Sequence, residues 1–197
     1  NESKISYLQK KNKISFQKNI SYQNPYDKGN FQHFMLKEIH EQPSVLKSTQ
    51  SKYTSEYFVD FETKFRHLFE VGKIVLVGCG TAYHASMVGE YYFNHFTNKE
   101  VSTELASELR YKKINKNKQI LFIFISQSGE TMDTLMALKY VKKMKHKSIV
   151  ITNSLESSMV REAEVTIPTY AQKEVGVAST KAFTCQLLSL ANLALEV

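Results

Sequence analysis

The chain has 197 residues, with 42% hydrophobic and 23% charged residues, which is typical of a globular protein with one domain and an extension. No apolar run reaches the ~18 residues of a membrane span, and the first residues lack the apolar core of a secretory signal. Cys79 and Cys185 are too few for a disulfide framework, so we expect a reducing, cytoplasmic setting. Asn1 in place of Met suggests a piece of a longer chain.

The net charge is +7 and the isoelectric point is about 9.2, values that raise the question of nucleic acid. The lysines lie among asparagines rather than among arginines and aromatic residues, so we interpret them as solvated faces and expect no nucleic-acid partner. A general attraction of anionic substrates stays open. The two lysine clusters are Lys112, Lys113, Lys116 and Lys118, and Lys139, Lys142, Lys143, Lys145 and Lys147.

The first 72 residues divide into two parts. Residues 1–30 are polar, which predicts a linker or the remnant of a missing N-terminal domain. Residues 31–72 read as a helical lead-in, because apolar residues recur at helical spacing from Phe31 onward. Pro43 should interrupt or kink the first of its helices. A second amphipathic segment covers residues 57–69.

Residues 73–197 alternate between strands and helices. Alternation of this kind predicts parallel pairing with right-handed crossovers, and so an α/β fold with a doubly wound, flavodoxin-like sheet of five parallel strands. The most apolar run, 120–125, is expected to be the central strand, and 101–105 an edge strand. The other predicted strands are 74–77, 148–152 and 165–167; the predicted helices are 83–96, 131–144, 157–163 and 180–197.

The last predicted helix is apolar over more than one face, as its residues Phe183, Leu187, Leu190 and Leu193 show. A band of that width needs two packing partners. It is either a fully buried core helix or an interface to a missing domain or a second subunit.

The first candidate motif, Gly78-Cys79-Gly80-Thr81, follows a strand and opens a helix. Its glycines allow a tight turn and close backbone approach, and Thr81 offers a hydroxyl near a helix N-terminus. A dinucleotide fingerprint needs a third glycine three residues after the second, but the next is Gly89. This spacing argues against a nicotinamide cofactor, and no Gly-Lys-Ser/Thr follows as in a Walker loop.

The second motif, Ser126-Gln127-Ser128-Gly129-Glu130-Thr131, follows the most apolar strand. Three hydroxyls, an amide and a glycine turn converge where a helix begins, an arrangement suited to a phosphate dianion. The alternative is that Ser128 or Thr131 only caps the helix. One cap does not need so many polar groups, so we favour phosphate binding. Glu130 is expected to point away from the phosphate.

The third motif, Gly176-Val177-Ala178-Ser179-Thr180-Lys181, precedes the last helix. Its position favours a contact at the rim of the same site, with Lys181 meeting an anion or only solvent. Capping of the helix by Ser179 or Thr180 is nearly as good an interpretation.

The sequence gives little support for nucleophilic catalysis, a metal site or a cofactor. Cys79 has no histidine and acid paired with it nearby, so we assign it no nucleophilic role. The six histidines show no ligand spacing with cysteine or acid, and we expect neither a metal site nor a cofactor.

Taken together, residues 77–85, 126–131 and 177–183 resemble the sugar isomerase (SIS) domains of the glutamine–fructose-6-phosphate aminotransferase family. The stretch from Asp27 to Pro43 resembles the family's entry into that region, so the resemblance covers residues 27–197.

The resemblance implies that the chain handles fructose 6-phosphate, from which the family makes glucosamine 6-phosphate with glutamine as nitrogen donor. It implies that Ser126, Gln127, Ser128 and Thr131 hold the phosphate and neighbouring sugar oxygens. Thr81 and the backbone at Cys79 and Gly80 would line the same pocket, with Val177 and Ser179 on another wall. Ala82 stands where many relatives carry Ser, which removes one hydroxyl.

The family also has parts that this sequence does not show. Its glutaminase domain begins with a nucleophilic cysteine, and a second SIS domain supplies a lysine, a glutamate and a histidine for isomerisation. We therefore expect a domain that binds the phosphosugar, as a homodimer or with a second SIS domain, and does not complete the reaction alone. The alternatives are a stand-alone, non-catalytic phosphosugar sensor and an unrelated flavodoxin-like nucleotide binder.

Overall fold

The computed structural model describes residues 26–197, which build a sheet of five parallel strands in the order β2-β1-β3-β4-β5. Every residue of β3 is buried, as expected for a central parallel strand covered on both faces. The predicted doubly wound sheet is confirmed, with β3 at its centre and β2 at one edge. The strands are β1 (Lys73–Gly78), β2 (Glu100–Leu105), β3 (Ile120–Ser126), β4 (Lys147–Thr152) and β5 (Val165–Pro168).

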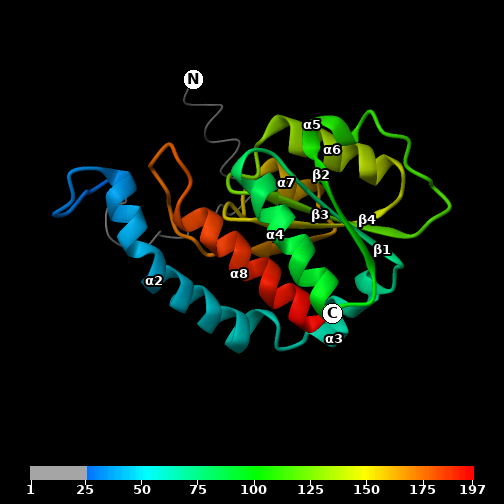
Figure 1. The fold of residues 1–197 in the computed structure, drawn as a ribbon, viewed down its shortest axis with the longest axis horizontal. Coiled ribbons are helices and arrows are strands. Elements are labelled where there is room, and N and C mark those ends of the chain that lie inside the picture. The colour runs from blue at the N-terminus through cyan, green and yellow to red at the C-terminus, as the bar shows by residue number, and fades with distance from the viewer. Residues whose placement is uncertain (1–25) are drawn as a thin grey trace, which may run out of the picture.

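Alternate residues of each strand enter different cores, because strand side chains point to opposite faces in turn. Ile74 and Leu76 of β1 lie in one core, and Val75 and Val77 lie in the other. Helices α4 (Thr81–Phe96) and α8 (Lys181–Glu196) cover the first face, and α5 (Ala106–Leu109), α6 (Met132–Lys143) and α7 (Ser158–Glu162) cover the second (Figure 1).

The four predicted helices of the sheet region begin and end within a few residues of α4, α6, α7 and α8. Helix α5 was not predicted, because four residues are too few to show a helical period. In the part of the chain that the structure describes, no helix is both long and apolar enough to cross a bilayer.

The lead-in begins with α2 (Phe34–Lys52) and continues as three short pieces rather than one amphipathic helix over residues 57–69. These are the π-helical turn η1 (Tyr53–Tyr57), α3 (Phe61–Lys64) and the 3₁₀ turn η2 (Arg66–Phe69). Aromatic side chains from the short pieces enter the α4/α8 core. The predicted boundary at residue 72 stays a prediction. The linker predicted for residues 1–30 lies, up to residue 25, outside the described residues.

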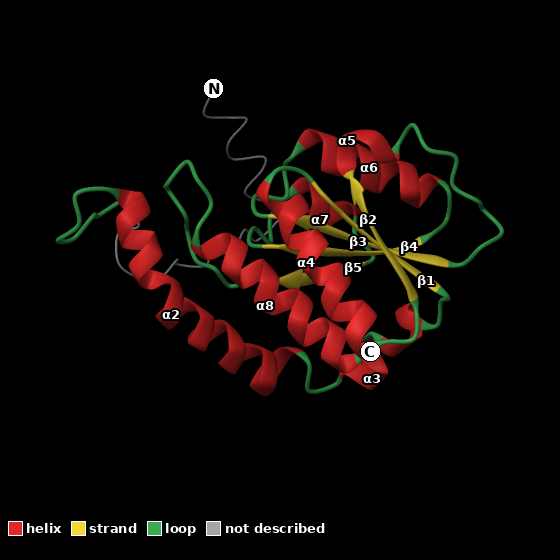
Figure 2. Cartoon of the chain, in the orientation of Figure 1, coloured by secondary structure: helices red, strands yellow, loops and turns green. Residues whose placement is uncertain are grey.

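Helix α2 continues through Pro43 and curves along its length (Figure 2). Of the two outcomes expected at Pro43, an interruption of the helix does not occur. A proline leaves the carbonyl four residues earlier without its backbone donor. In α2 that carbonyl belongs to Ile39, and the Gln42 side-chain amide donates to it at 3.2 Å. A side chain thus replaces the missing backbone bond.

Helix α2 also resolves the question of the wide apolar band on α8. It packs along the face of α8 that is turned away from α4, where Val45 shares a small core with Ala182 and Cys185. Its Thr49 hydroxyl lies 3.9 Å from the Cys185 sulfur, and burial raises the pKa of that thiol to about 11. The described residues therefore supply both packing partners of α8, although Leu195 stays exposed.

The pH dependence of folding should depend on His146. Its ring packs against Phe122, with 5.5 Å between ring centroids, and its Nε2 has no hydrogen-bond partner among the described residues. Burial lowers the pKa of His146 below 6.5, so the unfolded chain binds a proton more readily and stability falls as the pH drops from about 7 to about 5.

Urea midpoints at the two pH values measure this effect. We expect His146→Leu to lose less stability on acidification than the wild type, while His33→Leu, at an exposed histidine, keeps the wild-type slope. Equal slopes in the wild type and His146→Leu would contradict the assignment.

Candidate functional site

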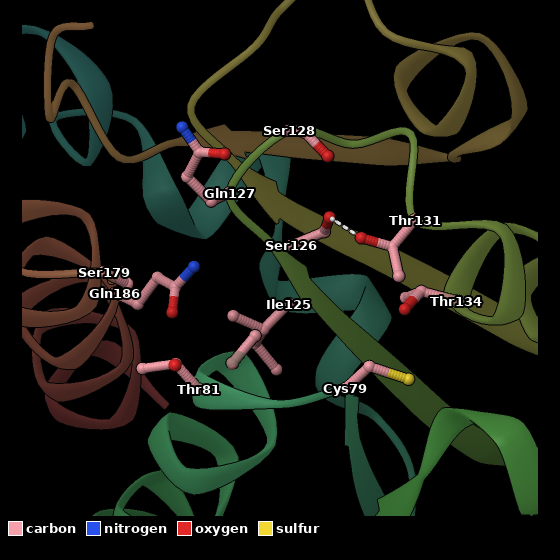
Figure 3. Close-up of a pocket in the computed structure, with 11 residues that line it drawn as sticks. Cys79, Thr81, Ile125, Ser126, Gln127, Ser128, Thr131, Thr134, Ser179 and Gln186 are labelled. Carbon is pink, nitrogen blue, oxygen red and sulfur yellow. Dashed lines mark hydrogen bonds between the residues drawn. The ribbon is translucent and has the colours of Figure 1, made fainter. Parts of the chain in front are cut away.

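A pocket of about 150 Å³ lies at the carboxyl edge of the sheet, where β1 and β3 end. Strand order reverses between these two strands, and ligands of open parallel sheets bind at such a point. Figure 3 shows side chains from the ends of both strands and from α4, α6 and α8 around it. The lining residues are Cys79, Thr81, Ala82, Ile125, Ser126, Gln127, Ser128, Thr131, Thr134, Ser179 and Gln186.

The structure brings together residues from all three candidate motifs. Cys79 and Thr81 come from the first, Ser179 comes from the third, and the second supplies most of its length. That these residues bind a ligand stays a prediction; what the fold adds is that residues as far apart in the sequence as Cys79 and Ser179 surround one cavity. From the second motif the lining residues are Ser126, Gln127, Ser128 and Thr131.

Three other candidates do not line the pocket. Gly80 forms the turn between Cys79 and Thr81, and the side chain of Val177 is fully exposed. Lys181 is only 3% exposed, and its ammonium group pairs with Glu41 of α2 at 2.8 Å. Lys181 therefore ties α8 to α2 and meets neither of the two environments expected for it, a bound anion or solvent.

Sequence reasoning missed two polar residues of the lining. Thr134 lies one helical turn after Thr131, a spacing that puts both on one face of α6. Gln186 is a polar residue within the apolar band of α8. The helical spacing was a usable signal for Thr134, whereas Gln186 could be placed only once the packing of α8 was known.

Hydrogen bonds within the second motif leave two of its three hydroxyl protons available, since the bond between Ser126 and Thr131 uses one. Ser126 Oγ accepts from the Gly129 N–H at 3.0 Å, and Ser128 Oγ accepts from the Glu130 N–H at 3.2 Å. A hydroxyl that accepts one bond still has its own proton to donate. Thr131 is the N-cap residue of α6, yet its side chain makes no capping bond and lies 3.3 Å from the Ser126 hydroxyl. The motif is therefore more than a simple helix cap.

Two other helix N-termini carry carboxylates. Glu174 Oε1 accepts from the Thr180 N–H at 2.8 Å and the Ala182 N–H at 3.2 Å, at the start of α8. Glu130 Oε1 accepts from the Ser158 N–H at 2.7 Å, at the start of α7, and this bond lowers the pKa of Glu130. Glu130 thus points away from the pocket, as expected.

The N-termini of α4 and α6 are different. Among residues 26–197, no carboxylate accepts a hydrogen bond from a backbone N–H at either helix start, and the N-cap residues Gly80 and Thr131 make no side-chain capping bond. Residues at the start of both helices line the pocket. Because a helix N-terminus carries a partial positive charge, the ends of α4 and α6 make the pocket favourable for an anion without any cationic side chain.

A family comparison identifies the fold around this pocket. The SIS domain model matches residues 67–196, about two thirds of the chain. The chain belongs to the SIS domain family.

The relatives of this SIS domain are longer proteins. It is 44% identical over 184 residues to the glutamine–fructose-6-phosphate aminotransferase (isomerizing) of Mesorhizobium japonicum, covering 91% of this chain and 30% of that protein. Identity to the enzyme of the same name from Pseudomonas aeruginosa is 46% over 176 residues, covering 87% and 29%. The chain therefore spans less than a third of these curated relatives.

Solved structures of related sequence share the fold of this SIS domain. The C-terminal domain of glucosamine-fructose-6-phosphate aminotransferase from Francisella tularensis has a TM-score of 0.80 and 41% identity, covering 86% of this chain and 48% of that one. A glucosamine-6-phosphate deaminase from Thermotoga maritima follows with a TM-score of 0.65 and 27% identity, covering 82% and 48%.

In this SIS domain, α2 holds one wall of the pocket in place. The carboxylate of Glu38, only 3% exposed, accepts from the backbone N–H groups of Val175 and Gly176. These residues belong to the loop that leads to Ser179. The lead-in therefore shapes the pocket through a buried carboxylate bound to the loop backbone.

Close packing beside the pocket requires one glycine of the first motif and one of the second. A Cβ on Gly78 would lie 2.7 Å from the backbone carbonyl carbon of Ala82, so only glycine lets α4 start this near the strand end. Gly129 has a φ of +64°, and a Cβ there would lie 2.1 Å from Ser157 Oγ.

Gly129→Ala should therefore destabilise the SIS domain through two separable causes. We expect a loss above about 2 kcal/mol, of which about 1–2 kcal/mol is backbone strain at positive φ and the rest is the clash with Ser157. Adding Ser157→Gly should restore only the part of the free energy of unfolding that the clash removes. Urea denaturation measures both variants.

Gly29→Ala is a matched control, because Gly29 has a φ of +57° and no atom of residues 26–197 lies within 4 Å of its added Cβ. Gly29→Ala should lose only the free energy of unfolding that backbone strain at positive φ costs. Full stability of Gly129→Ala, or no recovery on adding Ser157→Gly, would contradict the assignment.

Proposed function

We propose that this SIS domain binds fructose 6-phosphate for a glutamine–fructose-6-phosphate aminotransferase that forms glucosamine 6-phosphate. The phosphate lies against the Ser126–Thr131 loop and the start of α6, and the sugar extends toward Thr81 and Ser179. The domain contributes binding, and a second SIS domain contributes the acid–base groups of the isomerisation.

The observation that carries this proposal is that the uncapped N-termini of α4 and α6 lie beside hydroxyl groups that still have a proton to donate. Ser128 and one of the pair Ser126 and Thr131 can donate to a phosphate oxygen while the loop keeps its internal bonds, and the third hydroxyl can donate once the Ser126–Thr131 bond is given up. The N-termini of α7 and α8 already hold carboxylates, so an anion is favoured at α6 and α4. Neutral donors and helix dipoles are sufficient to hold a phosphate.

The lining also supports a shared reaction site. Among its described residues it has no carboxylate, imidazole or ammonium group, so general acid–base catalysis needs groups from elsewhere. Its volume of about 150 Å³ is below the ~300–1,000 Å³ of ordinary ligand pockets. A pocket this small encloses the phosphate and the nearest part of the sugar, and it leaves the rest for a partner surface, such as a second SIS domain or a second copy of the chain.

Titration calorimetry with fructose 6-phosphate tests this function. We expect saturable binding by the wild-type chain and a loss of at least tenfold in affinity in a Ser126→Ala, Ser128→Ala double variant, since two donors to a charged ligand are removed. Thr131→Val, which leaves both serine-to-backbone bonds in place, should weaken binding in the same direction.

The matched control is Ser44→Ala, Ser55→Ala, at two exposed serines of the lead-in. It should bind as the wild type does. A folded wild-type chain that does not bind fructose 6-phosphate, or binds it equally well in the double variant, refutes the proposal for this chain.

A further inference from the structure

Two polar atoms buried in the pocket have no hydrogen-bond partner among residues 26–197, the part of the chain that the structure describes. They are Thr134 Oγ1 and Gln186 Oε1. Thr134 is 0% exposed and Gln186 is 2% exposed, and both line the cavity. An unpaired buried polar group costs about as much free energy as a lost hydrogen bond, so each of these atoms is positioned to gain a partner when a ligand enters.

The two atoms lie on different sides of the cavity. Figure 3 shows Thr134 on α6 beside Thr131, and Gln186 on α8 across the pocket, with Ser126 between them. The polar groups that await a ligand are therefore divided between an α6 side and an α8 side, rather than gathered at one point.

The chemistry of the two sides is different. At the α6 side, the Thr134 hydroxyl can donate beside an uncapped helix N-terminus, which suits an anionic oxygen. At the α8 side, Gln186 Oε1 is an acceptor and needs a donor from the ligand. A phosphate dianion has no proton to give, whereas a sugar hydroxyl does.

We propose that Gln186 is the residue that distinguishes a sugar phosphate from phosphate alone, by accepting a hydrogen bond from a sugar hydroxyl. Thr134 donates to the phosphate at the opposite side. This inference rests on the proposed function and extends it by assigning each unpaired atom to one part of the ligand.

The test compares fructose 6-phosphate with inorganic phosphate in amide chemical-shift titrations, which also measure weak affinities. Gln186→Leu should weaken fructose 6-phosphate binding about tenfold and leave the affinity for inorganic phosphate unchanged within about twofold. Thr134→Val, of the same shape without the hydroxyl, should weaken both ligands by a similar factor.

Thermal unfolding without ligand separates binding from folding. Because Gln186 Oε1 has no hydrogen-bond partner among the described residues, Gln186→Leu should unfold at or above the wild-type temperature. Gln186→Met keeps the unbranched length of the side chain and serves if the leucine variant packs poorly. A marked drop in the unfolding temperature of both variants would show a structural role and overturn the inference.

The remaining outcomes separate the inference from the proposed function. Binding that is lost in Ser126→Ala, Ser128→Ala but unchanged in both Gln186 variants overturns the inference and leaves the function standing. An equal loss of both ligands in the Gln186 variants also overturns it. A folded wild-type chain that binds neither ligand overturns the proposed function, and the inference with it.

Discussion

The reversal of strand order between β1 and β3 is the constraint on which the rest of this SIS domain depends. The helices that follow these neighbouring strands, α4 and α6, leave toward opposite faces of the sheet, so their N-termini separate and a pocket opens between them. Carboxylates occupy the N-termini of α7 and α8 instead. The backbone path and the placement of Glu130 and Glu174 together decide where an anion is favoured.

The lead-in adds a second constraint, acting on the wall of the pocket. Glu38 binds the backbone of the loop before Ser179, and Glu41 pairs with Lys181. Losing one partner of such a buried contact leaves the other unpaired and costs more than the bond itself contributes. α2 is therefore part of the site's architecture, although none of its residues lines the pocket.

The strand pattern and the three motifs made most of the fold and much of the pocket predictable. Continuous apolar runs such as β3, and polar turns directly after β1 and β3, are local signals. Thr134 was not predicted, although its helical spacing from Thr131 was a usable signal. Gln186 and the pairing of Lys181 were not predicted, because both depend on how α8 packs between α4 and α2. The wide apolar face of α8 showed that two partners were needed but not that α2 was the second.

The most direct test of the central claim is to map where fructose 6-phosphate perturbs the backbone amides of the wild-type chain. A larger hollow of about 530 Å³ lies at the amino edge of the sheet, lined in part by Lys73, Lys99 and Lys118. The account predicts saturable shifts at residues 126–134 and 79–82, with none around this hollow. Shifts at the amino edge instead, with the Ser126–Thr131 loop unchanged, would contradict it.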